Sequence, residues 1–595
     1  MKTKNKWLLL PIILMIGFVP LIVRMYTYDC KLEQFDWFPD TAATQSDFFL
    51  YYKMVAIMVL AIVMVALLVW RCLADKRAFQ WNNIFFCILA YGILALLSAL
   101  FSPYRYFAFR GSYEMFESVG AVLGYLVVCF YTYQMVRDKD DVIHVVKYAG
   151  IGMLLVTLIG VFQYWGLDLF RSTFGKKLIT PVSYWPDVDT LSFTFPLKTS
   201  YITLYNTNYL AFYFGLLIPV LVALVLFAKD YKWKMACAIF TVLAAIALVG
   251  SNSKSAFLAF VGTFIVGVIV LWPQLKKKWW IFGSFIVGFV AVMLVYAMRW
   301  GGVSGSAQMI KMGTEGVAYD YAITEIETND EDVVFHVNGE ELHISYQYDE
   351  AEGSITLSVL DENGNSVAYS QADDTGCIHV DDAKYQDCSV TPIQIEEDLG
   401  LQVTMDGLNW YFVNKDNTYY YYNAFGKYTK MNKIEKADVF TDSIVSGRGE
   451  LWNYLIPKLK QCVILGTGAN TFAMTYPNDN YIAKKYKNLE SLFDVKAHNM
   501  YFQQWLEEGL LALICFLVFY VWYFVSSLRL YWKVKKQDTI SAIGIGILLG
   551  TVTYMIAGLA NDSNVCTAPV FWTAIGIGLA VNRIVKTSDF YFEKN

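Results

Sequence analysis

The chain has 595 residues, of which 56% are hydrophobic and only 17% are charged. A soluble globular domain carries about 25% charged residues, so this composition excludes an ordinary soluble enzyme and predicts a membrane protein. The formal net charge of −5 gives no reason to expect a nucleic-acid partner.

Apolar runs long enough to cross a bilayer recur along the chain, since a transmembrane helix needs about 20 mostly apolar residues. We therefore expect an α-helical polytopic membrane protein with about twelve transmembrane helices. Their approximate limits are 7–25, 51–71, 82–101, 117–136, 143–165, 208–228, 235–250, 255–273, 279–298, 509–529, 539–560 and 566–583. The first run has no small-residue cleavage site before Arg24, so we expect a retained helix and not a signal peptide.

Lysine and arginine clusters in the short loops predict the orientation, because such clusters concentrate on the cytoplasmic side. They lie at residues 2–6, 71–77, 229–234, 276–278 and 529–536. With twelve helices all five clusters fall on one side, which places both termini in the cytoplasm. We expect a multi-pass protein of the cell membrane whose longer loops are extracytoplasmic.

The segment 300–442 differs from the rest of the chain in charge and in periodicity. Between Lys311 and Asp442 there are 27 acidic and 7 basic residues, a net charge of −20, which leaves +15 for the remainder. Three pairs of strand-like runs flank Asn338-Gly339, Asn363-Gly364 and Asp406-Gly407, and such dipeptides favour hairpin turns. This pattern predicts an acidic, β-rich extracytoplasmic insert domain.

The expected organisation therefore has four parts. They are a membrane domain with nine helices at 1–299, the insert at 300–442, an extracytoplasmic loop at 443–508, and the last three helices with a cytoplasmic tail at 509–595. The sequence leaves open whether Cys377 and Cys388 form a disulfide. It has no metal-spaced His/Cys pattern, so we expect neither a structural zinc site nor another cofactor.

Polar residues precede the sixth expected helix, in FPLKTSYITLYNTNYLAFY (Phe195–Tyr213). Asn206 and Asn208 could simply cap that helix while Lys198 anchors at the lipid headgroups. Alternatively, the amides, the cation and the helix N-terminus converge on an anionic ligand.

Only a few polar residues, SNSKSA (Ser251–Ala256), separate the seventh and eighth expected helices. Lys254 is either a lysine whose amine reaches the interface or a fixed positive charge facing a phosphate.

The external loop 443–508 holds two further candidates. In SGRGELW, Ser446 and Glu450 could form a helix-capping box, which does not require Arg448. Arginine offers a planar fork of donors that suits phosphate or carboxylate. In HNMYFQQWLEEGLL, His498 is the one histidine of five expected beside the outer membrane face, and an imidazole is the usual general base.

Taken in order, NTNYLA, SNSKSA, SGRGELW, LGTGANTF (Leu465–Phe472) and HNMYFQQWLEEGLL resemble the O-antigen ligase and polymerase family of membrane glycosyltransferases. The acidic insert is additional to that pattern. The resemblance implies a fold of the GT-C-like type and a metal-independent glycosyltransferase. Its donor would be a glycan on a polyprenyl diphosphate, and its acceptor a hydroxyl of a glycan, lipid or glycoprotein at the external membrane face.

The resemblance also implies roles for individual residues. His498 and Arg448 match the family's histidine and arginine, and we expect them to be catalytic. Lys254, Arg448 and Lys198 would bind the diphosphate, although Lys254 and Lys198 stand where arginine is usual. The residues expected to support the substrate are Asn206, Asn208, Asn499, Tyr501 and Glu507.

Two other function classes fit twelve helices. A transporter or flippase of polysaccharide or lipid-linked oligosaccharide usually shows internal repeats, of which the sequence gives no convincing sign. A membrane sensor would need a cytoplasmic signalling module, but the cytoplasmic loops are short. The sequence does not distinguish a ligase from a polymerase.

Overall fold

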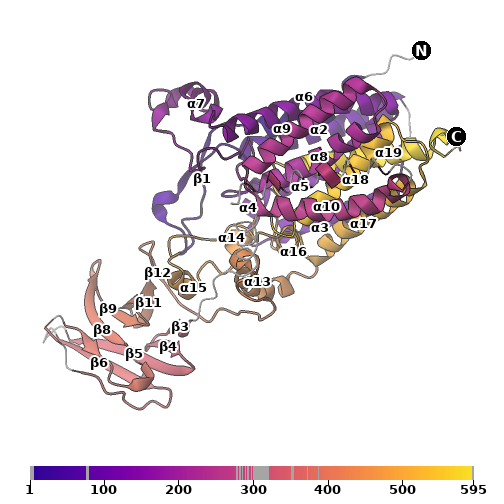
Figure 1. The fold of residues 1–595 in the computed structure, drawn as a ribbon. Coiled ribbons are helices and arrows are strands. Elements are labelled where there is room, and N and C mark those ends of the chain that lie inside the picture. The colour runs from indigo at the N-terminus through magenta and orange to yellow at the C-terminus, as the bar shows by residue number, and fades with distance from the viewer. Residues whose placement is uncertain are drawn as a thin grey trace.

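The computed structural model describes residues 6–75, 79–276, 321–349, 354–370, 373–374, 376–385 and 387–592, with individual residues between 279 and 298. A helical bundle and a β-rich domain make up most of it, and a helical loop lies between them (Figure 1).

Within the described residues, eight helices are long and apolar enough to cross a membrane. They are α2 (Tyr51–Asp75), α6 (Lys139–Tyr164), α8 (Tyr209–Phe227), α9 (Tyr231–Gly250), α10 (Lys254–Leu275), α17 (Leu510–Lys533), α18 (Thr539–Ala557) and α19 (Ala568–Lys586). Three shorter apolar segments contain α1 (Leu10–Gly17), α3 (Phe85–Phe101) and α5 (Val119–Met135). The helix expected at 279–298 falls outside the continuously described residues, so the count of twelve stays a prediction.

Helix α18 lies at the centre of the bundle, where its side chains are almost all buried. It can lie close to α8 because glycines face that helix. A Cβ added at Gly546 would come 2.4 Å from the Cα of Val220, and one at Gly550 would come 2.7 Å from the carbonyl oxygen of Leu216. Small residues allow such close backbone approach between membrane helices. The loop that follows α18 is therefore held over the middle of the bundle.

The loops that connect the helices of the bundle contain short elements. These are β1 (Tyr26–Asp29), β2 (Thr44–Asp47), α4 (Arg105–Arg110) and α7 (Thr173–Ile179). Lys53, at the start of α2, ties several of these segments together. Its fully buried amine donates hydrogen bonds of 2.7 Å to the carbonyl oxygens of Ile22, Phe49 and Thr203.

The β domain contains two antiparallel sheets. The first has the order β3 (Ile323–Thr328), β4 (Val333–Val337), β5 (Glu340–Asp349), β6 (Ser354–Asp361). The second has the order β12 (Tyr428–Thr429), β11 (Thr418–Tyr422), β10 (Leu408–Lys415), β9 (Asp398–Met405), β8 (Ser389–Ile395), β7 (Ile378–His379). Their apolar side chains share one core, which includes Phe335 and Trp410.

The turn dipeptides lie where the sequence predicts them. Asn338-Gly339 joins β4 to β5, and Asp406-Gly407 joins β9 to β10. After Asn363-Gly364 the chain returns along β6 with one isolated bridge, from Leu360 to Ser366. Cys377 and Cys388 are both free thiols. The backbone N–H of Val380, just after β7, donates to the carbonyl oxygen of Cys388, whereas Cys377 precedes β7 and is three positions earlier in the sequence.

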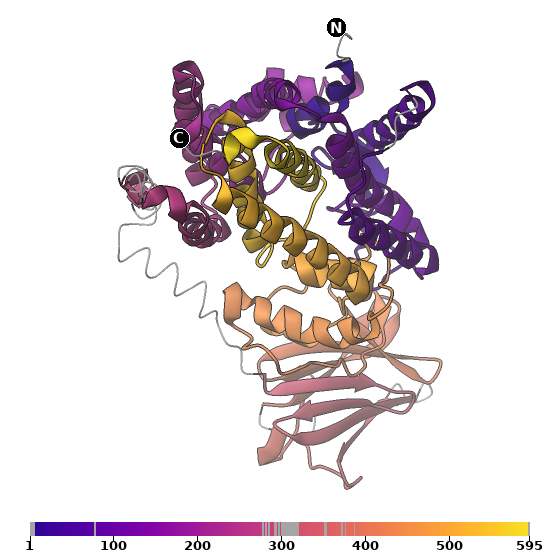
Figure 2. The same cartoon turned by 90° about the vertical axis from the view of Figure 1, so that its right-hand side faces the viewer.

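The loop 443–508 lies between the β domain and the bundle, as both views show (Figures 1 and 2). Its helices are α13 (Ile444–Gln461), α14 (Phe472–Thr475), α15 (Tyr481–Tyr486) and α16 (Met500–Glu508). The ends of the chain, marked N and C, lie toward the opposite end of the bundle from the β sheets.

The β domain is attached to its neighbours by specific contacts. Lys427 donates to the carbonyl oxygens of Glu33 (2.6 Å) and Phe35 (3.2 Å) in the first loop. Tyr486 of α15 donates to the Asp406 carboxylate at 2.7 Å, and Tyr481 packs into the core of the sheets. The domain is thus docked onto both the first loop and the loop 443–508.

Candidate functional site

The site is built around the loop 558–567, between α18 and α19, which contains four consecutive polar residues from Asn561 to Asn564. Asn564 accepts hydrogen bonds from the backbone N–H groups of Cys566 and Thr567, which fixes the entry into α19. Asn561 and Asp562 are buried. Because α18 is anchored at the bundle centre, this loop is a rigid base on which other segments meet.

His498 lies beside the Asp562 carboxylate. The Nδ1 atom of His498 is 3.5 Å from Oδ2 of Asp562. The imidazole is 33% exposed whereas the Asp562 side chain is only 2% exposed, so the ring can reach a ligand while its partner stays fixed. The backbone of His498 has a φ of 52°, in the left-handed region that non-glycine residues seldom occupy. This turn aims the ring at the loop 558–567.

The residues after His498 hold helix α16 against the same loop. The backbone N–H of Asn499 donates to Oδ1 of Asp562 at 3.2 Å, and its side-chain amide donates to the carbonyl oxygen of Leu559 at 3.2 Å. The Asn499 oxygen also caps α16. Tyr501 donates its hydroxyl hydrogen to the carbonyl oxygen of Met555 at 2.6 Å. Asn499 and Tyr501 therefore position the histidine.

Arg448 reaches this loop from α13. Its Nη1 atom donates a 2.5 Å hydrogen bond to the carbonyl oxygen of Ala560. Burial lowers the pKa of the guanidinium, and the nearby Asp562 carboxylate acts in the opposite direction. Among the described residues this is the one hydrogen bond of the guanidinium, so the other donors of the arginine fork can bind a ligand.

The start of α13 differs from the sequence prediction. The helix begins at Ile444, with Ser443 at the cap position, so Ser446 lies inside its first turn. Glu450 accepts a 2.9 Å hydrogen bond from the Tyr321 hydroxyl and pairs with Lys487. Glu450 thus connects α13 to neighbouring loops.

Several positive charges surround Asp562. Burial alone would raise the pKa of its carboxyl group, but the hydrogen bond and charge of His498, together with the charges of Lys496 and Arg448, lower it below its usual value. Asp562 is therefore an anion in contact with a cationic group of residues. The Lys496 amine lies 5.5 Å from the Tyr205 ring centre and 5.9 Å from that of Tyr209, which brings the end of the loop before α8 to the site.

A chain of hydrogen bonds joins the starts of α8 and α10 to the loop 558–567. The Asn208 side-chain oxygen accepts from Ser253 at 3.1 Å, and the hydroxyls of Ser253 and Ser255 are 2.9 Å apart. The Ser255 hydroxyl then accepts from the Asn561 amide at 2.9 Å. Lys254, the first residue of α10, lies between these two serines and is therefore held close to the site.

Asn206 and Lys198 occupy different positions. Asn206 stabilises the turn before α8, because its side-chain oxygen accepts the Asn208 N–H at 2.8 Å. Lys198 is exposed, and its side chain passes Gly166, just after α6. Within the described part of the chain, no contact joins Lys198 to Arg448 or His498.

Glu507 holds the glycine turn LGTGANTF in place. Its carboxylate accepts the backbone N–H groups of Asn470 (2.9 Å) and Phe472 (3.3 Å) and a hydrogen bond from Gln503. A Cβ at Gly466 would come 2.3 Å from the Glu507 backbone, so glycine is required by close approach. Gly468 has a φ of 104°, which also favours glycine.

Three carboxyl groups line a small cavity of about 30 Å³ behind this turn, namely Glu117, Glu507 and Glu508. Glu117 precedes α5 and accepts hydrogen bonds from Tyr125 (2.9 Å) and Ser563 (3.0 Å). Burial raises the pKa of Glu117 to about 7 and that of Glu507 to about 8. The cavity therefore contains protonatable groups next to the loop 558–567.

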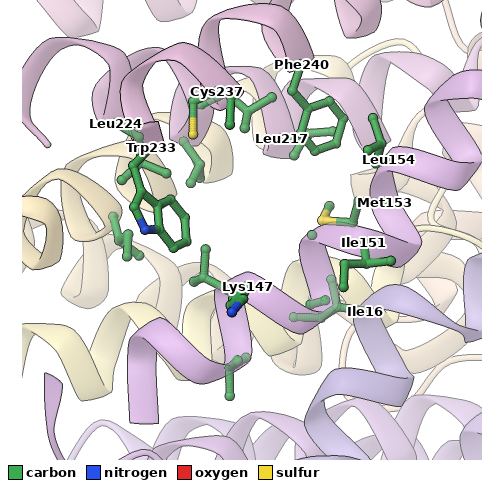
Figure 3. Close-up of a pocket in the computed structure, with 18 of the residues that line it drawn as sticks. Ile16, Lys147, Ile151, Met153, Leu154, Leu217, Leu224, Trp233, Cys237 and Phe240 are labelled. Carbon is green, nitrogen blue, oxygen red and sulfur yellow. The ribbon is translucent and has the colours of Figure 1, made fainter. Parts of the chain in front are cut away.

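A larger hollow of about 740 Å³ opens elsewhere, between α6, α8 and α9 (Figure 3). Leu154, Leu217 and Phe240 are typical of its lining, and Lys147 is one of its few polar residues. None of the site residues predicted from the sequence lines it. Its apolar walls offer few donors to a diphosphate or a sugar, so the polar site around Asp562 is the better candidate for chemistry.

Sequence reasoning missed Asp562, Asn561, Lys496 and Glu117. The run Asn561–Asn564 between two apolar helices was an available signal, since four polar residues there are more than a tight connection needs. Glu117 and Lys496 carried no local signal, because only the fold brings them to the site.

Residues 410–517 match the family model described as O-Antigen ligase. The match begins within β10 of the β domain and ends within α17, so it contains Arg448, the glycine turn and His498. Over this segment the match agrees with the resemblance seen in the motifs, and it supports a ligase- or polymerase-type function in polysaccharide assembly. No curated protein and no solved structure matches the chain.

Proposed function

We propose that this chain, which carries an O-antigen ligase domain, transfers a glycan from a polyprenyl-diphosphate carrier to an acceptor hydroxyl at the external membrane face. The observation that carries the proposal is the meeting of His498, Asp562 and Arg448 beside the loop 558–567. A base, its anionic partner and a guanidinium are the groups that such a transfer needs.

The reaction breaks the bond between the anomeric carbon of the donor sugar and the diphosphate oxygen. The acceptor oxygen forms the new bond to that carbon, and His498 takes the proton that this oxygen loses. The resulting imidazolium is stabilised by Asp562, at 3.5 Å. No metal is required for this proton transfer.

The leaving diphosphate gains negative charge as the bond breaks. Fixed cations in a site of low dielectric stabilise such charge strongly. In our proposal Arg448 and Lys254 take this role, and Lys496 supplements them from its position beside Asp562. Lys198 lies on the loop between α6 and α8. It binds the diphosphate, as expected from the sequence, only if the donor extends over that loop.

The insert and the loop 443–508 are extracytoplasmic in this proposal. The positions of the chain ends support it, since they lie toward the end of the bundle opposite the β sheets. The β domain packs against the loop that contains Arg448 and His498, so it is placed where it can contact the acceptor.

The test is to replace His498 by alanine and to measure surface polysaccharide and lipid-linked glycan in the same cells. We expect the surface polymer to be lost and the lipid-linked donor to accumulate. His144→Ala is the matched control, because His144 lies on α6, outside the site. Normal polymer in the His498→Ala cells would refute the proposal.

The accumulated donor also separates the two activities. Single repeat units on the carrier would identify a polymerase, whereas long chains on the carrier would identify a ligase. Purified protein with extracted donor should release polyprenyl diphosphate only when an acceptor is added.

A further inference from the structure

Acidic and histidine side chains form a row across the first sheet of the β domain. In the antiparallel register Glu325 of β3 lies opposite His336 of β4, and His336 lies opposite Glu341 of β5. Residues directly opposite one another project from the same face of a sheet. Glu327 lies two residues along β3, on that same face.

The His336 ring is oriented by two carboxylates. Its Nδ1 atom is 3.6 Å from Oε1 of Glu341, and its Nε2 atom is 4.0 Å from Oε1 of Glu327. When Nδ1 carries the hydrogen and faces Glu341, Nε2 presents its lone pair toward Glu325 and Glu327. A histidine that binds a metal usually has this arrangement, with a carboxylate on its second nitrogen.

Glu325 and Glu327 lie next to each other on β3, and the Lys433 amine donates a 2.7 Å hydrogen bond to Oε2 of Glu325. One ligand atom from each, together with one from His336, lies within 4.8 Å of the others. The Oε1 atom of Glu325 is buried, and no residue that the structure describes forms a hydrogen bond with it. A cation bound between two neighbouring carboxylates relieves their mutual repulsion.

We propose that Glu325, Glu327 and His336 form a binding site for a divalent transition-metal ion, with Zn²⁺ as the favoured occupant. Imidazole and carboxylate ligands suit zinc. A tetrahedral zinc ion holds its donor atoms about 3.4 Å apart, so the 4.0 Å separation of His336 and Glu327 closes by less than about 1 Å. Water completes the coordination, since the ligands are partly exposed.

The surrounding residues fit this assignment. Glu341 also lies 3.8 Å from Nε2 of His343, and Nδ1 of His343 lies 2.7 Å from Asp332. Carboxylate–histidine contacts thus continue from Glu341 through His343 to Asp332, away from the proposed metal. On the other side, the Lys433 amine lies 2.7 Å from Oε2 of Glu325 and is 72% exposed. An exposed lysine is a weak competitor, because surface ion pairs contribute little.

Spacing rules could not find this site, because its ligands come from two strands and their order in the sequence has no metal signature. The sequence therefore predicted no metal. The inference concerns the insert alone and does not depend on the proposed glycosyl transfer. A second group, Asp373, Cys377 and His379, also brings three donors within 4.8 Å of one another, among the described residues. It lies at the β7 edge of the second sheet and serves as an internal control.

The test uses the full chain, purified in detergent, treated with a chelator and then titrated with ZnCl₂ in a calorimeter. We expect one zinc ion per chain. His336→Gln should weaken the affinity by more than about 100-fold, and Glu341→Gln, which removes only the orienting carboxylate, by about 10- to 100-fold. Lys433→Gln should strengthen binding several-fold, because it removes a competing cation. His379→Gln should leave the affinity unchanged.

Absence of zinc binding by the unaltered chain would overturn the proposal. So would binding that survives His336→Gln and disappears with His379→Gln, since the ion would then lie in the second sheet. Thermal unfolding in chelator checks that His336→Gln still folds. If it does not fold, the opposite effects of Glu341→Gln and Lys433→Gln still decide the outcome.

Discussion

Replacing Asp562 by asparagine tests how the proposed base is supported. The substitution keeps the size of the side chain and removes its negative charge. The asparagine oxygen can still accept the Asn499 N–H, and the Arg448 bond goes to the backbone of Ala560, so both contacts survive. The interaction that changes is the one between Asp562 and the imidazolium of His498.

The size of the effect follows from the geometry. Two unit charges 3.5 Å apart attract by about 5 kcal/mol at an effective dielectric constant of about 20. Because the imidazole is 33% exposed, solvent screening reduces this to about 2–3 kcal/mol. If the imidazolium forms in the transition state, the rate should fall about 30- to 150-fold.

The assay is the initial rate of polyprenyl diphosphate release by purified protein supplied with extracted lipid-linked glycan and acceptor. Thermal unfolding of Asp562→Asn should remain close to that of the parent chain. Asp479→Asn, at an exposed position in the same loop, is the matched control and should retain full activity. A loss of less than about threefold, with normal folding, would refute the support of His498 by Asp562.

Three further predictions concern stability in detergent. Burial raises the pKa of Glu117 from its usual 4.5 to about 7, so the folded chain binds the proton more tightly and loses on the order of 3 kcal/mol as pH rises from about 4.5 to 7. Thermal unfolding against pH should show this decline, and Glu117→Gln should make it shallower, while the part that Glu507 contributes remains. Glu507→Ala leaves the N–H groups of Asn470 and Phe472 without their acceptor. The melting temperature should therefore fall by an amount that corresponds to about 2–4 kcal/mol, and Glu507→Gln should restore part of the lost stability. Lys427→Met should release the β domain from the loop before α2, which contains Glu33 and Phe35. Limited proteolysis between residues 30 and 45 should then become faster, while the Lys430→Met control should be cleaved at the parental rate.

Much of the helical framework and of the insert could be predicted from the sequence. The length of an apolar run identifies helices such as α8 and α18, because each membrane-spanning helix must by itself match the thickness of the bilayer. The turns at Asn338-Gly339 and Asp406-Gly407 are likewise local, since they depend on the backbone freedom of two residues.

The site could be predicted only in part. Arg448 and His498 stand out by residue type and position, and the structure brings both to the loop 558–567. Asp562 could not be paired with His498 from the sequence, because the two lie far apart along the chain and the pairing depends on how α18 packs. For Glu507 the sequence suggested support of a substrate, whereas its contacts hold the glycine turn.

The buried lysine at the start of α2 has a consequence for how the protein is made. The three carbonyl oxygens that accept from Lys53 belong to residues 22, 49 and 203. When α2 enters the membrane, the segment around Thr203 has not yet been synthesised, so the ammonium group lacks one of its acceptors. A charged amine without acceptors is costly away from water. We therefore expect the final packing of α2 to depend on a segment 150 residues later in the sequence, and the insertion of the first helices to be coupled to that of α8.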